Sequence, residues 1–314
     1  MIYGTGSYRY EEVKNWAAAV KSRWNVKECA GITVDREDRI YLLTRTVPPV
    51  ILLDSDGTIL ASFGGDVFVR AHGMFRSSKD IVYGVDDGGH AVYAFDSQYR
   101  VTQVWGTRGV PSDTGCINKD YKTIRRSAGP FNFPTRIAED TDGFLYVSDG
   151  YGNARVHKFS PDGELIQSWG EPGSGPGQFN LPHGIAVSKD NIVYVADRQN
   201  HRIQLFTTNG KLLDIWDGFH RPSDIWIDKQ GVLFIAECKR SSDFFSDAPS
   251  RVSICSPDGH LLSRLEDESS IYDPDKGSHC AHGLCVDSEG SLYITEVGKQ
   301  LSDIFLGIRK YRRL

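Results

Sequence analysis

Three of the nine histidines in this chain recur at one position of an internal repeat, and small residues hold that position in the other repeats. In chain order, the six residues at the repeated position are Ala30, His72, Thr135, His183, Ser223 and His282. Three imidazoles that converge and leave a fourth position open are the ligand set of a catalytic zinc site. The pattern therefore predicts a Zn²⁺ centre, although another divalent metal would fit the same nitrogen ligands. The alternative is that each histidine packs a turn of its own repeat.

Two arginines and a tyrosine follow the second predicted strand of their repeats. Arg45 belongs to the first repeat and Arg198 to the fourth, so in a ring of six they should face each other across a central channel. A pair of guanidinium groups suits a carboxylate ligand, whereas an ordinary ion pair is the alternative role. Tyr151 follows the same strand end in the third repeat, one residue after the equivalent Gly150, and its phenol could act as a general base beside a metal. Without a metal nearby, it would be a packed aromatic residue.

The elements that must position these residues are short strands. Two stretches align throughout, FPTRIAEDTDGFLYVSDGYGNARVHKFSPDGELIQSWG from Phe133 and LPHGIAVSKDNIVYVADRQNHRIQLFTTNGKLLDIWDG from Leu181. Each reads as four strands with alternating apolar residues, and its Asp-Gly or Asn-Gly pair suits a tight turn. The repeated position recurs after 42, 63, 48, 40 and 59 residues. Four strands in roughly 40–45 residues are typical of a propeller blade, so the sequence predicts an all-β, six-bladed β-propeller.

One domain spanning residues 1–314 accounts for the whole chain, with blades from about residue 27 to 314. The last blade is short of a strand, because only 18 residues follow Glu296. We expect an N-terminal strand at about residues 7–16 to pair with this blade and close the ring, which removes an open sheet edge. The alternative is a loosely packed N-terminal arm.

Two of the spacings are long because residues 106–130 and 239–250 are inserted into the repeat. Strands within a blade are antiparallel, so both insertions should emerge on the face that carries the site. Solvated loop is the alternative for all of their side chains. The candidates for substrate contact are Asp113, Lys119, Arg125, Arg126, Phe244 and Phe245.

Charge and composition restrict the partners and the setting. Lys plus Arg number 36 and Asp plus Glu number 41, so the net charge is 36 − 41 = −5, and it is spread along the chain. This argues against binding to nucleic acid or to an anionic membrane, and no apolar run approaches the roughly 20 residues of a membrane span. The six cysteines contain no CxxC pair, and the N-terminus has no signal-peptide pattern. We expect a cytoplasmic monomer with free thiols, a small carboxylate substrate and no organic cofactor.

The segments SDGYGNARVHKFSPDGELIQSWG, GQFNLPHGIAV and VYVADRQNHRIQLF resemble the peptidyl-α-hydroxyglycine α-amidating lyase family of NHL-repeat propellers and its bacterial members. The resemblance is close from Phe131 to Phe206 and weaker in RAHGM, in TR at 44–45 and in CAHGL. It implies a six-bladed propeller with a zinc ion and a lyase that cleaves the C–N bond of an N-acyl α-hydroxyglycine, giving an amide and glyoxylate. The residues that it implies are the zinc ligands His72, His183 and His282, the catalytic Tyr151, and the substrate-binding Arg45 and Arg198.

The chain departs from the family at several positions. Gly283 replaces an aspartate that follows the third histidine, and Cys280 replaces a methionine two residues before it. The family's structural Ca²⁺ would use this aspartate and the carbonyls of Ile32 and Met74, so the calcium site is not expected here. The family's disulfide cysteines are also missing, which favours a cytoplasmic setting.

Two other functions stay open at the level of the sequence. One is a metal-dependent hydro-lyase or hydrolase that uses the same three histidines on another small carboxylate substrate. The other is a non-catalytic NHL propeller that binds a partner.

Overall fold

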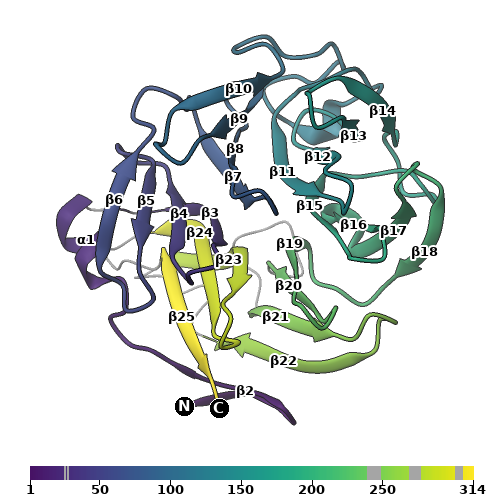
Figure 1. The fold of residues 1–314 in the computed structure, drawn as a ribbon. Coiled ribbons are helices and arrows are strands. Elements are labelled where there is room, and N and C mark those ends of the chain that lie inside the picture. Colours follow the sequence, from purple (N-terminus) through teal and green to yellow (C-terminus); the bar gives the residue numbers. More distant parts are fainter. Residues whose placement is uncertain (25, 27, 239–248, 269–276, 301–306) are drawn as a thin grey trace. The chain divides into compact units, whose positions relative to one another are not determined.

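The computed structural model describes the chain except for residues 25, 27, 239–248, 269–276 and 301–306. Six antiparallel sheets account for the strands of the described residues, and each is one blade (Figure 1). The predicted fold, an all-β six-bladed β-propeller, is confirmed. Within the described part of the chain, no helix is long and apolar enough to cross a membrane. The chain divides into two compact units, unit 1 with residues 1–66 and 223–314 and unit 2 with residues 67–222. That residues 1–314 form a single domain stays a prediction.

Unit 2 contains blades 2, 3 and 4, each a four-stranded sheet. Blade 2 comprises β7 (Ala71–Arg76), β8 (Val82–Asp86), β9 (Ala91–Phe95) and β10 (Val101–Trp105). Blade 3 comprises β11 (Pro134–Glu139), β12 (Leu145–Asp149), β13 (Arg155–Phe159) and β14 (Leu165–Trp169). Blade 4 comprises β15 (Pro182–Val187), β16 (Ile192–Asp197), β17 (Arg202–Thr207) and β18 (Leu212–Trp216). Two short 3₁₀ helices, η1 (Tyr121–Thr123) and η2 (Arg198–Asn200), lie between strands.

Unit 1 contains blades 1, 5 and 6. Blade 1 comprises β3 (Cys29–Val34), β4 (Ile40–Thr44), β5 (Val50–Leu53) and β6 (Ile59–Phe63), and the helix α1 (Ala18–Trp24) precedes it. Blade 5 comprises β19 (Pro222–Ile227), β20 (Leu233–Glu237), β21 (Ser250–Cys255) and β22 (Leu261–Asp267). Blade 6 comprises β23 (Gly277–Val286), β24 (Leu292–Gln300), β25 (Ile308–Arg313), β2 (Tyr8–Glu12) and β1 (Ile2–Thr5).

The N-terminal strand of blade 6 lies where the sequence predicts it. Strand β2 pairs antiparallel with β25, and Tyr10 lies opposite Arg313. Strand β1 adds a fifth, outer strand, which the sequence analysis did not foresee. The side chain of Tyr10 is fully buried against Leu292 and Tyr311, so the N-terminal segment belongs to the core of unit 1.

The pattern of burial within a blade follows the sequence. The two middle strands of blade 3 are almost entirely buried, whereas its outer strand β14 is partly exposed and ends on the buried Trp169. Burial along a whole strand is expected where both faces of a sheet pack against neighbouring sheets. The turn before β14 places Gly163 at φ 93°, a conformation that glycine adopts without steric cost.

A β-bulge lies at the repeated position of the first strand. In blade 2, Ala71 pairs with Asp86 and Gly73 pairs with the adjacent Val85, so His72 is the extra residue. The same shift in register occurs around Ala30, Thr135, His183 and His282. A bulge bends a strand and redirects one side chain. The bulge therefore explains why this one position of the repeat can serve a site.

Acidic residues at the end of the second strand anchor the segment that enters the same blade. In unit 2 the buried Asp86, Asp149 and Asp197 accept backbone N–H bonds from Arg70, Asn132 and Asn180, at 2.7, 3.0 and 2.8 Å. In unit 1, Glu237 binds the guanidinium of Arg251 at 2.9 Å instead. The three backbone bonds in unit 2 fix the segment that leads into the first strand and its bulge.

Candidate metal centre

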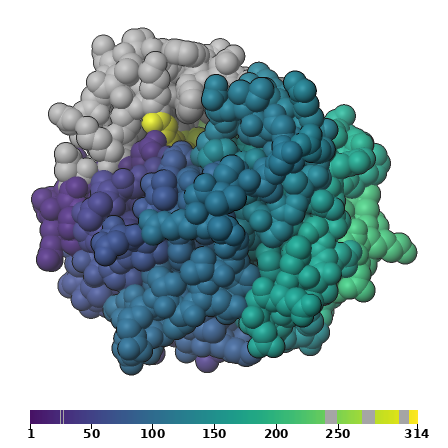
Figure 2. All heavy atoms as spheres, turned by 90° about the horizontal axis from the view of Figure 1, so that it is seen from above, coloured from purple at the N-terminus to yellow at the C-terminus, as the bar shows by residue number. Residues whose placement is uncertain are grey.

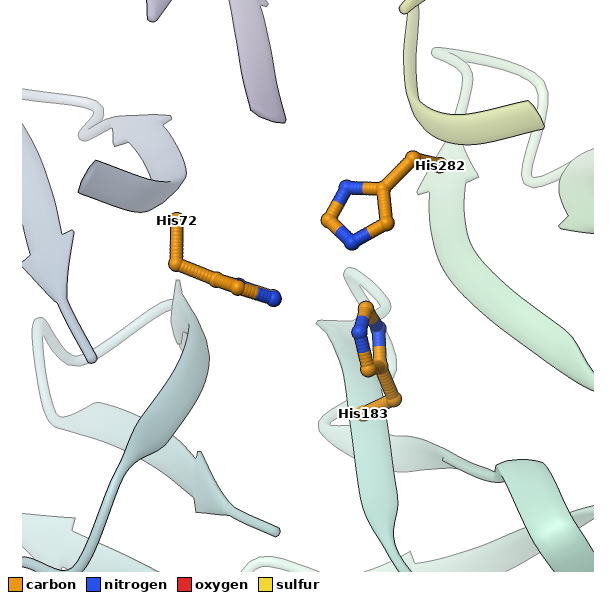
Figure 3. A group of neighbouring side chains, drawn as sticks. All are labelled: His72, His183 and His282. Carbon is orange, nitrogen blue, oxygen red and sulfur yellow. The ribbon is translucent and has the colours of Figure 1, made fainter. Parts of the chain in front are cut away.

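In unit 2, two histidines and a tyrosine converge. The imidazole rings of His72 and His183 lie with their centroids 4.9 Å apart, and both side chains are buried. The phenolic oxygen of Tyr151 is 3.2 Å from Nε2 of His72 and 3.1 Å from Nε2 of His183. In Figure 3 the two rings extend from β7 and β15 toward a common point. The structure thus brings together these three predicted site residues of unit 2, and their roles as metal ligands and base stay predictions.

A backbone carbonyl fixes the orientation of the first histidine. Nδ1 of His72 lies 2.8 Å from the carbonyl oxygen of Thr135, which holds the repeated position of the next blade. A carbonyl can only accept, so Nδ1 carries the proton and Nε2 keeps its lone pair. Metal-binding histidines are oriented by such a bond in the same way.

The same hydrogen bond from a histidine to a backbone carbonyl recurs in unit 1. His282 is buried, and its Nδ1 lies 2.6 Å from the carbonyl oxygen of Ala30, again the repeated position of the next blade. Its Nε2 is therefore also the nitrogen that is able to bind a cation. The two histidines share a position, a bulge and a hydrogen-bond pattern, which indicates a common role.

Arg198 reaches the phenol from the end of β16. Its Nη1 is 3.4 Å from the oxygen of Tyr151, and the side chain is buried. The neighbouring Asp197 binds the backbone N–H of Asn180 and the side chain of Arg202. Burial raises the pKa of Asp197 to about 6, against the lowering effect of the hydrogen bonds from Asn200 and Asn180 and of the Arg202 charge. Arg198 therefore follows a buried carboxylate, Asp197, whose oxygens already accept hydrogen bonds from Asn180 and Arg202.

Arg45 lies in unit 1, where Nη1 binds Oε2 of Glu28 at 2.5 Å. Both side chains are partly exposed, so the ion pair itself contributes about 1 kcal/mol at most. This is the ion pair that the sequence left as the alternative role of Arg45. That Arg45 binds substrate together with Arg198 stays a prediction.

The insertion at 106–130 reaches the site. Nζ of Lys119 lies 4.6 Å from the ring centroid of Tyr151 and 4.8 Å from that of Phe133. It also binds Oδ2 of the buried Asp87 at 2.6 Å, and Arg70 binds the same oxygen. The connection between β10 and β11 lies on the surface of unit 2, and blue-teal atoms of this part of the chain are visible in Figure 2. Of the candidates proposed from the insertions, Lys119 is the one that contacts Tyr151 in the described residues.

The other candidates lie elsewhere. Asp113 and Arg126 form an exposed ion pair with each other, and Arg125 is exposed. Phe244 and Phe245 lie outside the described residues, so the position of the second insertion remains a prediction.

Two histidines outside the repeated position hold the backbone that leads into the next repeat. Nδ1 of His90 accepts the backbone N–H of Phe133 at 3.1 Å, and Nδ1 of His201 accepts that of Arg221 at 3.2 Å. In both cases the donor lies two residues before the next repeated position and has a positive φ. Burial lowers the pKa of His90, which favours the neutral ring that this bond requires. His90 and His201 each lie four residues after the acidic residue that ends the second strand, Asp86 and Asp197, and this shared spacing was the available signal.

The donor set of unit 2 fits a cation. A phenol has one proton, so it can donate to only one of the two Nε2 atoms beside it. Two imidazole nitrogens directed toward one point are Lewis bases that a divalent ion would satisfy, and the phenolic oxygen lies beside them. Arg198 and Lys119 add positive charge nearby, which favours an anionic substrate.

Comparison with known proteins agrees with this architecture. The sequence model of the NHL repeat matches residues 179–206. The chain is 30% identical over 276 residues to NHL repeat-containing protein 3 of Mus musculus, covering 82% of this chain and 73% of the relative. It is 33% identical over 171 residues to peptidylglycine alpha-amidating monooxygenase of Rattus norvegicus, covering 52% of this chain but only 16% of the relative.

A lyase is also among the similar proteins. The chain is 27% identical over 162 residues to the probable peptidyl-alpha-hydroxyglycine alpha-amidating lyase pgal-1 of Caenorhabditis elegans, covering 50% of this chain and 43% of the relative. Among solved structures, that of a catalytically inactive virginiamycin B lyase from Staphylococcus aureus covers the whole chain with a TM-score of 0.59 at 13% identity. At that identity the likeness shows the fold alone.

Proposed function

This chain belongs to the family of NHL-repeat propellers that includes NHL repeat-containing protein 3, and we propose that it is a metal-dependent carbon–nitrogen lyase. The substrate we propose is a small N-acyl α-hydroxyglycine, cleaved to an amide and glyoxylate. The observation that carries the proposal is the phenol of Tyr151 between Nε2 of His72 and Nε2 of His183. Similarity to the alpha-amidating lyases supports it over half of the chain. A monomeric, cytoplasmic enzyme is part of the same proposal.

The metal ligands that we propose are His72 and His183 of unit 2 and His282 of unit 1, and each of these three side chains is buried. Zinc suits three neutral imidazoles that leave a fourth position open. A bound divalent ion would polarise the hydroxyl of the substrate and so lower the free-energy cost of removing its proton. Calcium is not part of the proposal, because Gly283 offers no carboxylate.

Tyr151 is the general base in this proposal. As the phenolate, after its own proton has passed to solvent, its oxygen takes the proton of the α-hydroxyl group, and the electrons of the O–H bond form the carbonyl of glyoxylate. The C–N bond then breaks, and the amide nitrogen takes up a proton. Arg198 lies 3.4 Å from the phenolic oxygen, where its charge stabilises negative charge that develops there. Arg198, together with Arg45, would hold the carboxylate of the substrate.

Metal content tests the proposal first. We expect about one zinc per chain in the purified protein, a loss of metal in His183→Ala, and no loss in the control His260→Ala, whose side chain is exposed. Glyoxylate release from α-hydroxyhippurate then tests the reaction. A protein without stoichiometric metal would overturn the lyase and favour a non-catalytic propeller that binds a partner. Metal without glyoxylate release would favour a hydro-lyase or hydrolase with another substrate.

A further inference from the structure

We propose that Cys238 and Cys280 form a reversible disulfide that links blade 5 to blade 6 within unit 1. The structure contains both as thiols, and their Sγ atoms lie 2.6 Å apart. Unbonded heavy atoms of second-row elements settle at about 3.5–4.0 Å, and sulfur is larger than carbon. A bonded pair lies at about 2.05 Å. Two sulfur atoms this close are therefore placed for a bond rather than for packing.

The surroundings of the pair hold it in place. Cys238 directly follows Glu237 at the end of β20, and Cys280 lies in β23. Both side chains are buried, and Sγ of Cys238 is 3.5 Å from the carbonyl oxygen of Ala281. Ser250 joins the same two blades, because its Oγ donates to the carbonyl of Glu237 and accepts the N–H of Ala281 at 2.9 and 2.7 Å. The sulfur atoms thus lie at a contact between two blades that hydrogen bonds already join.

The place of the pair in the repeat gives the bond a consequence. Cys238 holds in blade 5 the position that Arg198 holds in blade 4, and Cys280 precedes His282 by two residues. A disulfide would tie the strand that carries His282 to the preceding blade. It would close a loop between residues 42 positions apart. The proposal is independent of the lyase reaction, because the bond forms whether or not a metal is bound.

The chemistry requires a two-electron oxidant, for which a hydroperoxide or a small disulfide serves. With hydrogen peroxide, one thiol becomes a sulfenic acid and releases water, and the second thiol displaces a second water as the S–S bond forms. With oxidised glutathione, two exchange steps release two molecules of the reduced tripeptide. A reducing compartment keeps the pair as thiols, whereas an oxidising one keeps the bond.

Thiol counting on the full chain tests the proposal. After treatment with oxidised glutathione and unfolding in denaturant, the wild type should show 6 − 2 = 4 thiols, and six after dithiothreitol. Cys238→Ser should rise to five thiols, because Cys280 loses its partner. The matched control Cys255→Ser should fall to 5 − 2 = 3. Burial raises the pKa of Cys255 to about 11, so this thiol is a suitably inert control.

Mass spectrometry of peptides from the unreduced wild type identifies the bond without any variant. We expect one cross-linked peptide that joins Cys238 to Cys280 and disappears on reduction. Six thiols after oxidation would overturn the proposal, and so would a bond between any other pair of cysteines. Neither measurement depends on metal content or on glyoxylate release, so failure of the disulfide is distinguishable from failure of the lyase.

Discussion

At the scale of single residues, the phenol of Tyr151 is the group whose surroundings have chemical consequences. His72 directs its Nδ1 proton to a carbonyl, so its Nε2 presents a lone pair to the phenol rather than a competing proton. Arg198 supplies a positive charge 3.4 Å from the phenolic oxygen. The phenolic oxygen thus lies beside two imidazoles and a guanidinium, and in the proposed reaction it removes the proton of the bound hydroxyl.

Removing the phenolic oxygen should remove the base and leave the metal site intact. For Tyr151→Phe, we expect turnover to fall by about 10²- to 10⁴-fold, the usual contribution of a general base, with unchanged metal content. Glyoxylate release and elemental analysis of the same preparation measure both. Tyr121→Phe, in η1 of the insertion, is the matched control and should keep full turnover. Equal turnover in Tyr151→Phe and the wild type would exclude this tyrosine as the base.

At the scale of elements, the insertion between β10 and β11 brings a cation onto the ring of Tyr151, the proposed base. Lys119 contacts the ring of Tyr151 and binds the buried Asp87, and Arg70 binds that carboxylate as well. One carboxylate and two cations leave a positive charge beside the phenol. We therefore expect the insertion to select substrates by charge.

Replacing this lysine tests that role. We expect Lys119→Met to raise KM about tenfold, which corresponds to 1.4 kcal/mol, because an attractive charge beside the substrate is lost. Metal content should not change. Lys119→Arg should keep most of the affinity, and Lys122→Met, an exposed neighbour in η1, is the control. An unchanged KM in Lys119→Met would assign the lysine to packing alone.

The strands were predictable and several of their connections were not. Period-two alternation and Asp-Gly or Asn-Gly turns locate the ends of β12 and β16 to within one residue, so Tyr151 and Arg198 could be placed at strand ends. The repeat also locates the bulge, because it keeps one position in phase. The contact of Lys119 with Tyr151 depends on how a long connection folds back, which local sequence does not encode. The roles of His90 and His201 depend likewise on bonds to the next blade.

At the scale of the whole molecule, the two ends of the chain share one sheet. Strand β2 pairs with β25, and β1 reaches the neighbouring blade, because Thr5 donates its backbone N–H to Oγ of Ser263 at 2.8 Å. Tyr3 adds an edge-to-face contact with Tyr311 at 5.3 Å. The sequence predicted the pairing because the last blade lacks a strand. It did not predict β1, since a five-stranded blade breaks the repeat.

Deletion of residues 1–12 should therefore destabilise the protein although it removes none of the proposed site residues. It exposes the edge of β25 and empties the place of Tyr10, and loss of a buried aromatic side chain alone costs about 3–5 kcal/mol. At about 2–4 °C for each kcal/mol in a chain of this size, the midpoint of thermal unfolding should fall by on the order of 10 °C. Deletion of residues 1–6, which removes β1 and spares β2, should lower it less. The substitution Tyr10→Ala gives the same test if the longer deletion does not fold. Equal midpoints for all of these variants and the wild type would show that the N-terminal strands do not stabilise blade 6.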